Sequence, residues 1–589
     1  MKEVLSYKKK LKLLRNLLKK RDCNYYLLPR TDKFQNEFIS EEDERVKWLT
    51  GFSGSFAFVI ISLKQNIIFT DGRYIDQIKK EVDQKTFKIL DINNKEPILW
   101  LKDKIQAKEK VLLDSWLFSC NKFNYLKKIV KEKKSKILLS KEILIDKIWK
   151  KKPNKIINKI FIRETKYSGI FFKNKIQHVK KILKDKKINS FFFSSPESIS
   201  WLLNIRSNQI KYVPIVLSFL LLNLNEKSYF FSKKNKNLEK YFSSYFIIFD
   251  LQDLREILIN FSITNKEIYL DPNKTPYFIE NFFKTIGVKV KYSQDPCENL
   301  KLIKNPIEIK GFKSSHIRDG VSVCKFLFWL DEIIKKNKKV SEIITSKKLF
   351  EFRKKNKLFR GLSFETISSF GSNGSIIHYR VSTKTNKILK KNNLYLYDSG
   401  AQYLDGTTDV TRTICIGDNP TQEQKDRFTR VLKGNLGLSN CSFSNRTTGS
   451  VLDKIARRHL KKKKLDYPHG TGHGVGSYLS VHEGPISISK SSKTKFKKGM
   501  VLTNEPGFYK TNQYGIRIEN IMLVIKKKKL LGFEILTLVP IDIKLIDTRL
   551  LNIQEKNWLN IYHKKVFNKI FKYLNKKERK WLKEKTAPI

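Results

Sequence analysis

The 589-residue chain is poor in cysteine, and its six cysteines lie far apart without a Cys-x-x-Cys pair. This spacing excludes a disulfide framework and a zinc ribbon, and it is typical of reduced thiols in a cytosolic protein. The chain also lacks an apolar run of the ~20 residues that a bilayer-crossing helix needs. Its longest apolar stretch, 213–224, is interrupted by Pro214, Ser218 and Asn223. We therefore expect no membrane partner.

The N-terminus lacks the apolar segment and the small-residue cleavage site of a signal peptide. Leucines at helical spacing alternate with lysines there, which predicts an amphipathic helix over residues 6–20. We accordingly expect a cytoplasmic protein. No repeat with a period of roughly 20–50 residues is visible, which excludes solenoids and propellers.

Acidic residues are scarce, since 57 of them face 119 basic residues and leave a formal net charge of +62. Such a charge would suit a polyanionic partner. A specific nucleic-acid surface, however, needs basic residues clustered on one element, with aromatic side chains placed for stacking. Here lysines occur in predicted helices and strands alike, which favours solvated faces over a single binding groove. We predict no specific nucleic-acid partner.

Length and a hydrophobic content of 40% predict several packed domains. After the first helix, short β-branched or aromatic runs end in turn residues, as in an α/β domain, and a second helix near 173–186 begins the same order again. A third region opens near residue 304 with a long amphipathic helix and continues as short strands and glycine-rich loops. The predicted domains are two similar α/β domains at 1–150 and 151–305, a third domain at 306–545 and a helical extension at 546–589.

Histidine placement is the first sign of a functional site. Five of the eight histidines lie between residues 378 and 482. His459 belongs to a basic run and is set aside, whereas lysine disappears around the other four, which are His378, His469, His473 and His482. Four stretches without lysine hold nine acidic residues and only two arginines; they are 392–424, 465–489, 499–509 and 511–525. A bound polycationic metal centre would explain this local negative charge.

The acidic residues in these stretches are placed to converge. Asp398 ends an alternating strand, and Asp409 follows eleven residues later, after a turn, so a hairpin could bring the two carboxylates side by side. His473 lies in HGTGHGVG, where alternating glycines let the backbone approach a site closely. Glu505 precedes a Pro-Gly pair, and Glu519 alternates with apolar residues in GIRIEN. Four carboxylates and one imidazole can hold two divalent cations, and ions about 3.5–4 Å apart can deprotonate a bridging water and polarise a scissile carbonyl.

Other catalytic motifs are absent. HGTGHGVG lacks the G-x-G-x-x-G spacing of a dinucleotide loop, and the sequence HEGP at 482–485 lacks the second histidine of H-E-x-x-H. No G-x-S-x-G nucleophile elbow accompanies the site. These absences favour the two-metal interpretation.

Five segments carry a distinctive signature: SIIHYR (375–380), YDSGAQYLDGTTDVTRT (397–413), HGTGHGVGSYLSVHEGP (469–485), NEPGFY (504–509) and GIRIEN (515–520). They closely resemble the pita-bread metallopeptidases, peptidase family M24, in the long three-domain cytosolic form of the aminopeptidase P branch. The resemblance extends to GFSGSFAFVI and TDGRY in the first domain and to SISWLLNIRS in the second. It implies an α/β and α+β multidomain chain, with two creatinase-like N-terminal domains before a C-terminal pita-bread catalytic domain.

The same resemblance implies a role for each site residue. Asp409 and Glu519 would bridge two metal ions, Asp398 would complete one ion, and His473 with Glu505 would complete the other. Mn²⁺ is the expected ion, with Zn²⁺ or Co²⁺ as alternatives. Glu505, His378 and His482 are the expected catalytic residues, and the expected substrate-binding residues are His378, His469, His482, Tyr509 and Arg517.

The implied activity is hydrolysis of the bond between any N-terminal residue and a penultimate proline through a dinuclear-metal-bound hydroxide. Peptides with proline at the second position are the expected partners, and a homodimer is the expected assembly. Two alternatives stay open at this point. One is a prolidase that acts on Xaa-Pro dipeptides, and the other is a pita-bread nucleic-acid or chromatin-binding protein.

Overall fold

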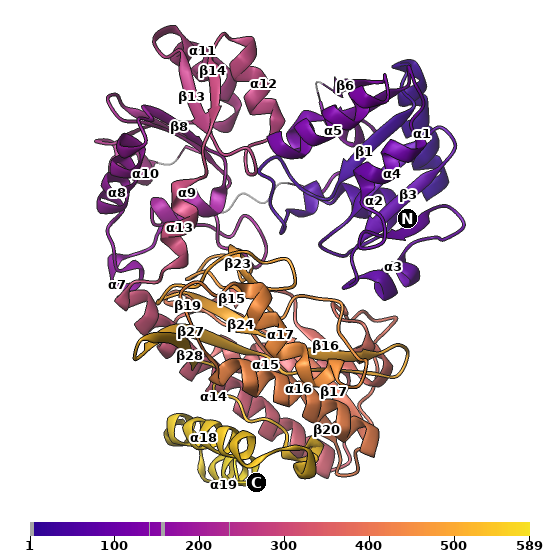
Figure 1. Ribbon diagram of the computed structural model, residues 1–589, viewed down its shortest axis with the longest axis vertical. Coiled ribbons are helices and arrows are strands. Elements are labelled where there is room, and N and C mark those ends of the chain that lie inside the picture. Colours follow the sequence, from indigo (N-terminus) through magenta and orange to yellow (C-terminus); the bar gives the residue numbers. More distant parts are fainter. Residues whose placement is uncertain (1–4, 141, 155–158, 235) are drawn as a thin grey trace. The chain divides into compact units, whose positions relative to one another are not determined.

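The computed structural model describes residues 5–140, 142–154, 159–234 and 236–589. The chain divides into two compact units (Figure 1). The first unit contains Met1–Ile162 and Phe171–Cys297, and the second contains Arg163–Ile170 and Glu298–Ile589. In the described residues, no helix combines the length and the apolar character needed to cross a membrane.

The first half of the first unit is a six-stranded mixed sheet in the order β4-β3-β2-β1-β5-β6. Its central strands β1, β2 and β3 are antiparallel, whereas β4, β5 and β6 are added in parallel. The strands are β1 (Tyr25–Pro29), β2 (Phe58–Ser62), β3 (Asn66–Thr70), β4 (Lys88–Asp91), β5 (Lys110–Asp114) and β6 (Lys136–Ser140). The helices are α1 (Tyr7–Lys20), α2 (Arg45–Thr50), α3 (Ile75–Glu81), α4 (Pro97–Lys104), α5 (Cys120–Glu132) and α6 (Leu144–Ile148).

The second half of the first unit repeats this topology, in the order β12-β11-β10-β8-β13-β14. Again three central strands are antiparallel and the outer ones are parallel, which confirms the predicted pair of similar α/β folds. The strands are β8 (Ser190–Phe193), β10 (Phe219–Asn223), β11 (Ser228–Phe231), β12 (Phe246–Phe249), β13 (Glu267–Leu270) and β14 (Lys289–Tyr292), and a small pair joins β7 (Phe161–Ile162) to β9 (Ile205–Arg206). The helices are α8 (Phe172–Asp185), α9 (Pro196–Leu202), α10 (Lys236–Phe242), α11 (Leu254–Thr264) and α12 (Tyr277–Thr285).

The second unit combines strongly bent antiparallel sheets with helices. Its largest sheet has the order β21-β28-β27-β24-β22-β23, and two three-stranded sheets have the orders β16-β17-β20 and β15-β18-β19. The strands are β15 (Phe359–Leu362), β16 (Ile367–Phe370), β17 (Asn393–Ser399), β18 (Ala401–Tyr403), β19 (Gly406–Thr407), β20 (Val410–Ile416), β21 (Ser442–Phe443), β22 (Gly472–Gly474), β23 (Glu483–Ile488), β24 (Val501–Asn504), β25 (Gly507–Lys510), β26 (Tyr514–Arg517), β27 (Asn520–Lys527) and β28 (Leu530–Ile535). The helices are α7 (Thr165–Ser168), α14 (Pro306–Lys335), α15 (Glu342–Lys354), α16 (Gln422–Asn440), α17 (Gly449–Lys461), α18 (Ile553–Ile570) and α19 (Lys576–Lys585), and α13 (Pro296–Leu302) precedes α14.

Helix α14 begins as the sequence predicts. Asn305 caps it by accepting hydrogen bonds from the backbone of Ile307 and Glu308, and Pro306 occupies the first turn, where a missing N–H costs nothing. Further along, Gly311 lets the helix approach the β18–β19 hairpin, because a Cβ there would lie 2.1 Å from the Asp405 carbonyl oxygen. The helix therefore supports the hairpin between the strands that carry Asp398 and Asp409.

Arg163 belongs to the second unit, although 127 residues of the first unit follow it in the chain. Its guanidinium is buried and donates to the Leu404 carbonyl at 3.1 Å and to the Ser477 carbonyl and hydroxyl at 2.8 and 2.9 Å. Glu308 lies 3.8 Å from it. Arg163 thus joins the β18–β19 hairpin to the loop that precedes His482.

The domain boundaries expected from the sequence stay a prediction.

Two buried histidines predict acid sensitivity of the second unit. Burial lowers the pKa of His316 and of His563 to about 4, and the Ile541 N–H donates to Nε2 of His563 at 3.2 Å. In the unfolded chain both imidazoles titrate near 6.5, so the unfolded state binds more protons below that pH. Each histidine should therefore cost stability as the pH falls from about 6.5 to 4, up to roughly 3 kcal/mol.

Urea unfolding measured between pH 4.5 and 7.5 checks this expectation. His563→Gln, which keeps an acceptor for the Ile541 N–H, should flatten the loss of stability on the acid side. His178→Gln is the matched control, because His178 lies exposed on α8. An equal pH dependence of the wild type and the His563 variant would contradict the prediction.

Candidate metal centre

Two of the expected ligands lie at the end of one antiparallel ladder. Strands β17 and β20 pair with Asp398 opposite Thr411 and Ser399 opposite Val410, and Asp409 directly precedes β20. The predicted hairpin is therefore present, with the small β18–β19 hairpin inserted at its tip. Both carboxylates are buried.

Glycines on both sides of His473 let strand β22 pack closely against its neighbours, which brings His473 to the carboxylates. His473 is the central residue of β22, which pairs with β23 and β24. A Cβ on Gly472 would lie 2.1 Å from the Thr503 carbonyl oxygen, so only glycine permits this approach to β24. Glu505 follows the end of β24, and Glu519 lies between β26 and β27. Five residues from four separate segments are thereby presented to one place.

The imidazole of His473 lies among the carboxylates. Nε2 of His473 lies 3.7 Å from Oδ2 of Asp409 and 3.5 Å from Oε1 of Glu505. One ligand atom each of Asp409, His473 and Glu519 lies within 4.8 Å of the others. Nδ1 of His473 is 3.0 Å from the Gly474 carbonyl, which holds the proton on Nδ1 and leaves the lone pair of Nε2 directed at the acids.

Burial makes this cluster of acids costly to ionise. It raises the pKa of Asp409 and of Glu519 well above the usual values, and neighbouring carboxylates, Asp398 and Glu505 among them, add to the rise. The pKa of Glu505 is raised to about 7, again chiefly by burial. A dication would reverse this balance, because it stabilises the ionised carboxylates.

Two further observations fit a pair of metal ions. Oδ1 of Asp398 and Oδ1 of Asp409 are buried, and neither has a hydrogen-bond partner in the described part of the chain. A buried carboxylate oxygen without a donor costs free energy unless another group, such as a metal ion, satisfies it. The donor set is four carboxylates and one imidazole, which suits divalent ions such as Mn²⁺ or Zn²⁺. The residues present therefore fit the group that the sequence predicts.

Arg517 links the acids to two expected substrate-binding residues. It donates to Oδ2 of Asp398 at 2.7 Å and to the Tyr509 hydroxyl at 2.6 Å. The Tyr509 hydroxyl also lies 2.9 Å from Nε2 of His469. Attraction to the Asp398 and Tyr509 side chains raises the pKa of Arg517, despite burial, so its charge is fixed. This chain of hydrogen bonds orients one face of the site.

The other two histidines border the same centre. The His482 ring lies edge-on to the His473 ring, with 4.4 Å between centroids. His378 is half-buried and follows the short helix η4 (Gly371–Ser375). The carbonyl of its neighbour Ile377 accepts a 3.4 Å hydrogen bond from Arg517. The structure therefore brings each expected site residue, or its immediate neighbour, to one buried centre.

Sequence reasoning missed the residues that hold Glu519. Thr411 donates to Oε2 of Glu519 at 2.8 Å, and Arg412 donates to the Glu519 carbonyl at 2.6 Å. Arg412 is buried, and within the described residues its guanidinium donates six hydrogen bonds. A signal was present, because Arg412 is one of two arginines that remain where lysine disappears.

A second set of missed residues holds His469. On α17, Arg457 donates to Oδ2 of Asp453 at 2.7 Å and to the His469 carbonyl at 2.5 Å, and its guanidinium lies 3.9 Å from the centroid of the Tyr467 ring. Thr471 donates to Oδ1 of Asp453 at 2.6 Å. Asp453 and Arg457, four residues apart on α17, therefore hold the loop in place at His469 and at Thr471. The spacing Asp453 to Arg457 is the sequence signal, but it is shared by many surface pairs.

Four family models match the chain in succession. Residues 10–145 and 151–308 match the Creatinase/Prolidase N-terminal domain, 312–526 match metallopeptidase family M24, and 529–589 match the C-terminal region of peptidase M24. The two matches at the N-terminus fall on the two sheets with the same topology.

Proteins and a solved structure of similar length resemble the whole chain. Xaa-Pro aminopeptidase 1 of Dictyostelium discoideum is 38% identical over 609 residues, covering 99% of this chain and 96% of that protein. A probable Xaa-Pro aminopeptidase P of Coprinopsis cinerea is 37% identical over 615 residues, covering 99% and 98%. The crystal structure of an X-prolyl aminopeptidase from Caenorhabditis elegans, described as a cytosolic enzyme with a di-nuclear active site, superposes with a TM-score of 0.95 at 32% identity, covering 99% of this chain and 100% of that one.

Proposed function

Because this chain belongs to metallopeptidase family M24, we propose that it is a metal-dependent aminopeptidase that removes any N-terminal residue preceding a penultimate proline. The observation that carries the proposal is the convergence of four carboxylates and His473, in a chain similar from end to end to Xaa-Pro aminopeptidases. A tertiary Xaa-Pro amide offers no N–H at its scissile nitrogen, so it requires a dedicated site.

Two divalent ions would be held by the five side chains of the cluster, with Mn²⁺ as the expected ion. The side chains that would hold them are Asp398, Asp409, His473, Glu505 and Glu519. Bound there, the ions would supply an activated water and polarise the scissile carbonyl. Thr411 and Arg412 keep Glu519 in place for this role.

The chain's own residues would handle the proton and the developing charge. Glu505 would take a proton from the attacking water and return it to the leaving nitrogen. His482 and His378 would donate to the oxyanion as it forms. His469, Tyr509 and Arg517 would hold the peptide and orient Asp398.

The cellular setting of the enzyme belongs to the same proposal. A homodimer in the cytoplasm is expected, and the similar Caenorhabditis elegans enzyme is described as cytosolic. Its substrates would be peptides with proline in the second position. The six cysteines are not disulfide-bonded in the described residues, which agrees with a reducing compartment.

Cleavage of matched substrates tests the proposal. Protein loaded with Mn²⁺ should release the first residue from Gly-Pro-Gly and from longer Xaa-Pro peptides, and it should cut a Gly-Pro dipeptide far more slowly. Preference for the dipeptide would identify a prolidase instead. No cleavage by protein with two bound metal ions would refute the proposal, and tight salt-dependent binding to duplex DNA by that protein would favour the nucleic-acid alternative.

Loss of the hydrogen bond from Arg457 to the His469 carbonyl should raise KM for an Xaa-Pro peptide. Arg457→Lys keeps the charge but loses the fork that reaches both Asp453 and the His469 carbonyl. Losing one such hydrogen bond, worth about 1–1.5 kcal/mol, should raise KM for Gly-Pro-Gly roughly tenfold while metal content stays at two ions. Steady-state kinetics with metal analysis on one sample measure both.

Arg430→Lys is the matched control for this prediction. Arg430 forms the same kind of i, i+4 pair with Asp426 on α16, at 2.9 Å, and its hydrogen bond to α17, 3.4 Å to the His459 carbonyl, lies at the end of that helix and not at the His469 loop. Its kinetics should be those of the wild type. An unchanged KM in the Arg457 variant would show that the α17 pair has no part in substrate binding.

A further inference from the structure

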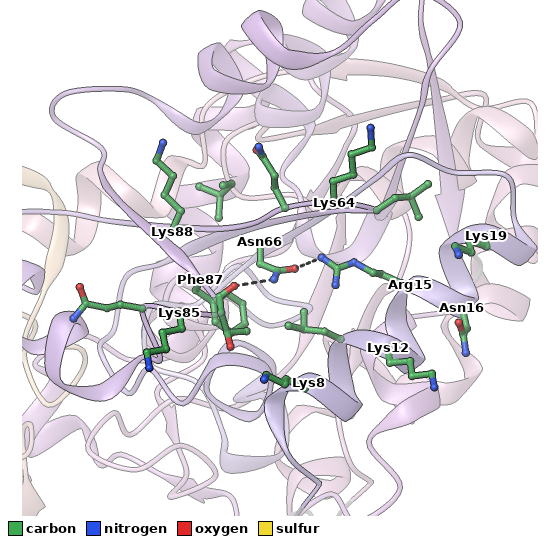
Figure 2. Close-up of a pocket in the computed structure, with 16 residues that line it drawn as sticks. Lys8, Lys12, Arg15, Asn16, Lys19, Lys64, Asn66, Lys85, Phe87 and Lys88 are labelled. Carbon is green, nitrogen blue, oxygen red and sulfur yellow. Dashed lines mark hydrogen bonds between the residues drawn. The ribbon is translucent and has the colours of Figure 1, made fainter.

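A basic pocket of about 810 Å³ lies in the first unit, far along the chain from the metal ligands (Figure 2). One face of α1, the turn between β2 and β3, and the segment leading into β4 form its walls. Seven of its sixteen lining residues are basic and none is acidic; the basic residues are Lys8, Lys12, Arg15, Lys19, Lys64, Lys85 and Lys88.

The helix contributes four of these charges on a single face. Lys8, Lys12, Arg15 and Lys19 are separated by four, three and four residues, which is the spacing of neighbours along one side of a helix. Like charges at this spacing destabilise an isolated helix. The adjacent face of α1 is buried through Leu11, Leu14 and Leu18, so packing holds the four charges together.

Hydrogen bonds of Arg15 and Asn66 join the three walls of the pocket. Its Nε donates to the Ser62 carbonyl at 3.0 Å, and its Nη2 donates to Oδ1 of Asn66 at 2.8 Å. Asn66 in turn donates to the Thr86 carbonyl at 2.8 Å. Figure 2 shows Arg15 and Asn66 joined at the centre, with Lys64, Lys85 and Lys88 around them. The pocket is therefore a built structure and not only a gap between mobile lysines.

The seven charges have no counter-charge at contact distance. Within the described residues, none of them lies within 4.0 Å of a carboxylate as an ion pair, whereas Lys102 and Lys110 in the same half of the unit pair with Glu132 and Asp22. Asp83 lies beside the β4 turn, but it accepts from the Thr86 hydroxyl at 2.6 Å and from the Lys85 backbone at 3.0 Å. Converging positive charge in a concave site concentrates anions there.

We propose that this pocket binds a small polyphosphate anion. Lysine ammonium groups bind phosphate as point charges, and a preorganised arginine adds directed N–H donors. A nucleic acid fits less well, because base stacking needs an accessible ring. The only aromatic lining residue is Phe87, whose side chain is 1% exposed. The pocket thus offers positive charge but no exposed aromatic ring on which a nucleobase could stack. Its proposed role does not depend on the proposed peptidase activity.

Calorimetric titration of the full-length protein with sodium tripolyphosphate at 150 mM salt tests the proposal. One tripolyphosphate should bind per chain, and inorganic phosphate should bind at least tenfold more weakly because it meets fewer of the cations. The triple variant Lys12→Gln, Lys64→Gln, Lys85→Gln removes one charge from each wall at exposed positions. It should weaken tripolyphosphate binding at least tenfold and leave the thermal transition unchanged.

The matched control removes the same number of charges elsewhere. Lys461→Gln, Lys462→Gln, Lys463→Gln alters an exposed basic run at the end of α17 and should leave tripolyphosphate binding within twofold of the wild type. Equal weakening in both triple variants would show that net charge alone attracts the anion and would overturn the proposal. Absence of binding at 150 mM salt would also overturn it. So would tighter binding of a short single-stranded DNA that the pocket variant weakens, which would assign the surface to nucleic acid.

Discussion

Asp409→Asn is expected to abolish peptide hydrolysis, with a loss of at least about 1,000-fold in kcat on an Xaa-Pro peptide. Asparagine keeps the shape of the side chain but loses the charge and one acceptor oxygen. Asp409 lies 3.7 Å from His473 within the group whose ligand atoms lie within 4.8 Å of one another. Neutralising Asp409 removes one of the four carboxylates that would hold the proposed ions, so metal binding should weaken.

Metal analysis and thermal unfolding separate this cause from misfolding. The Asp409 variant should hold fewer than two metal ions per chain. Stripped of metal, it should be more stable than the stripped wild type, because one of several buried, mutually repelling carboxylates has been removed. Asp405→Asn is the control, since Asp405 lies four residues earlier and pairs with Arg318. Full activity of the Asp409 variant would contradict the proposed metal centre.

Arg412→Met is expected to lower the free energy of unfolding of the second unit by about 4 kcal/mol or more. The change removes the arginine's hydrogen bonds from six buried acceptors. The Val539 carbonyl still accepts from the Tyr562 hydroxyl at 2.6 Å, and each acceptor left without a donor costs about 1–3 kcal/mol. The acceptors, with distances, are the carbonyls of Glu519 (2.6 Å), Thr411 (2.8 Å), Val539 (2.9 Å) and Pro540 (3.1 Å), Oδ1 of Asn520 (2.8 Å) and the Tyr562 hydroxyl (2.7 Å).

Urea titration measures this loss. Arg549→Met provides the comparison, because the Arg549 side chain is 78% exposed and its buried partner Asp547 keeps a hydrogen bond from Gln422 at 2.7 Å. The Arg549 variant should unfold at the wild-type urea concentration. An Arg412 variant that did the same would show that its hydrogen bonds are replaced by water at no cost. Because Arg412 also holds the Glu519 backbone, its loss should reduce metal content as well.

The two sheets of the first unit and the ligand hairpin of the second follow from local sequence. Each depends on a short run of alternating or apolar residues that ends in a turn, such as the run before Asp398, and such patterns are readable without knowledge of distant contacts. Helix α14 was predictable for the same reason, since its cap and first turn lie within four residues. Here local preference and tertiary structure agree.

The supports of the site were not predictable, because they join residues distant in the chain. Arg412 reaches Tyr562, 150 residues away, and Arg163 reaches Ser477, 314 residues away. A buried arginine is acceptable only when several acceptors surround it, and no local pattern reveals where those acceptors will be. The basic pocket escaped prediction similarly, because Lys64 and Lys88 meet the α1 lysines only after the sheet has formed. Basic residues that are scattered along the sequence therefore lie close together in the folded first unit.

Arg163 limits how this protein can be divided or recombined. The second unit is assembled from two pieces of chain, with the whole of Phe171–Cys297 inserted between them. A fragment that starts at residue 298 would lack the arginine that fills the space between Leu404 and Ser477, and would leave their carbonyls without this donor. A chimera that takes its C-terminal half from a relative would therefore need residues 163–170 from the same relative. In evolutionary terms, those eight residues should change together with the hairpin and the loop that they hold.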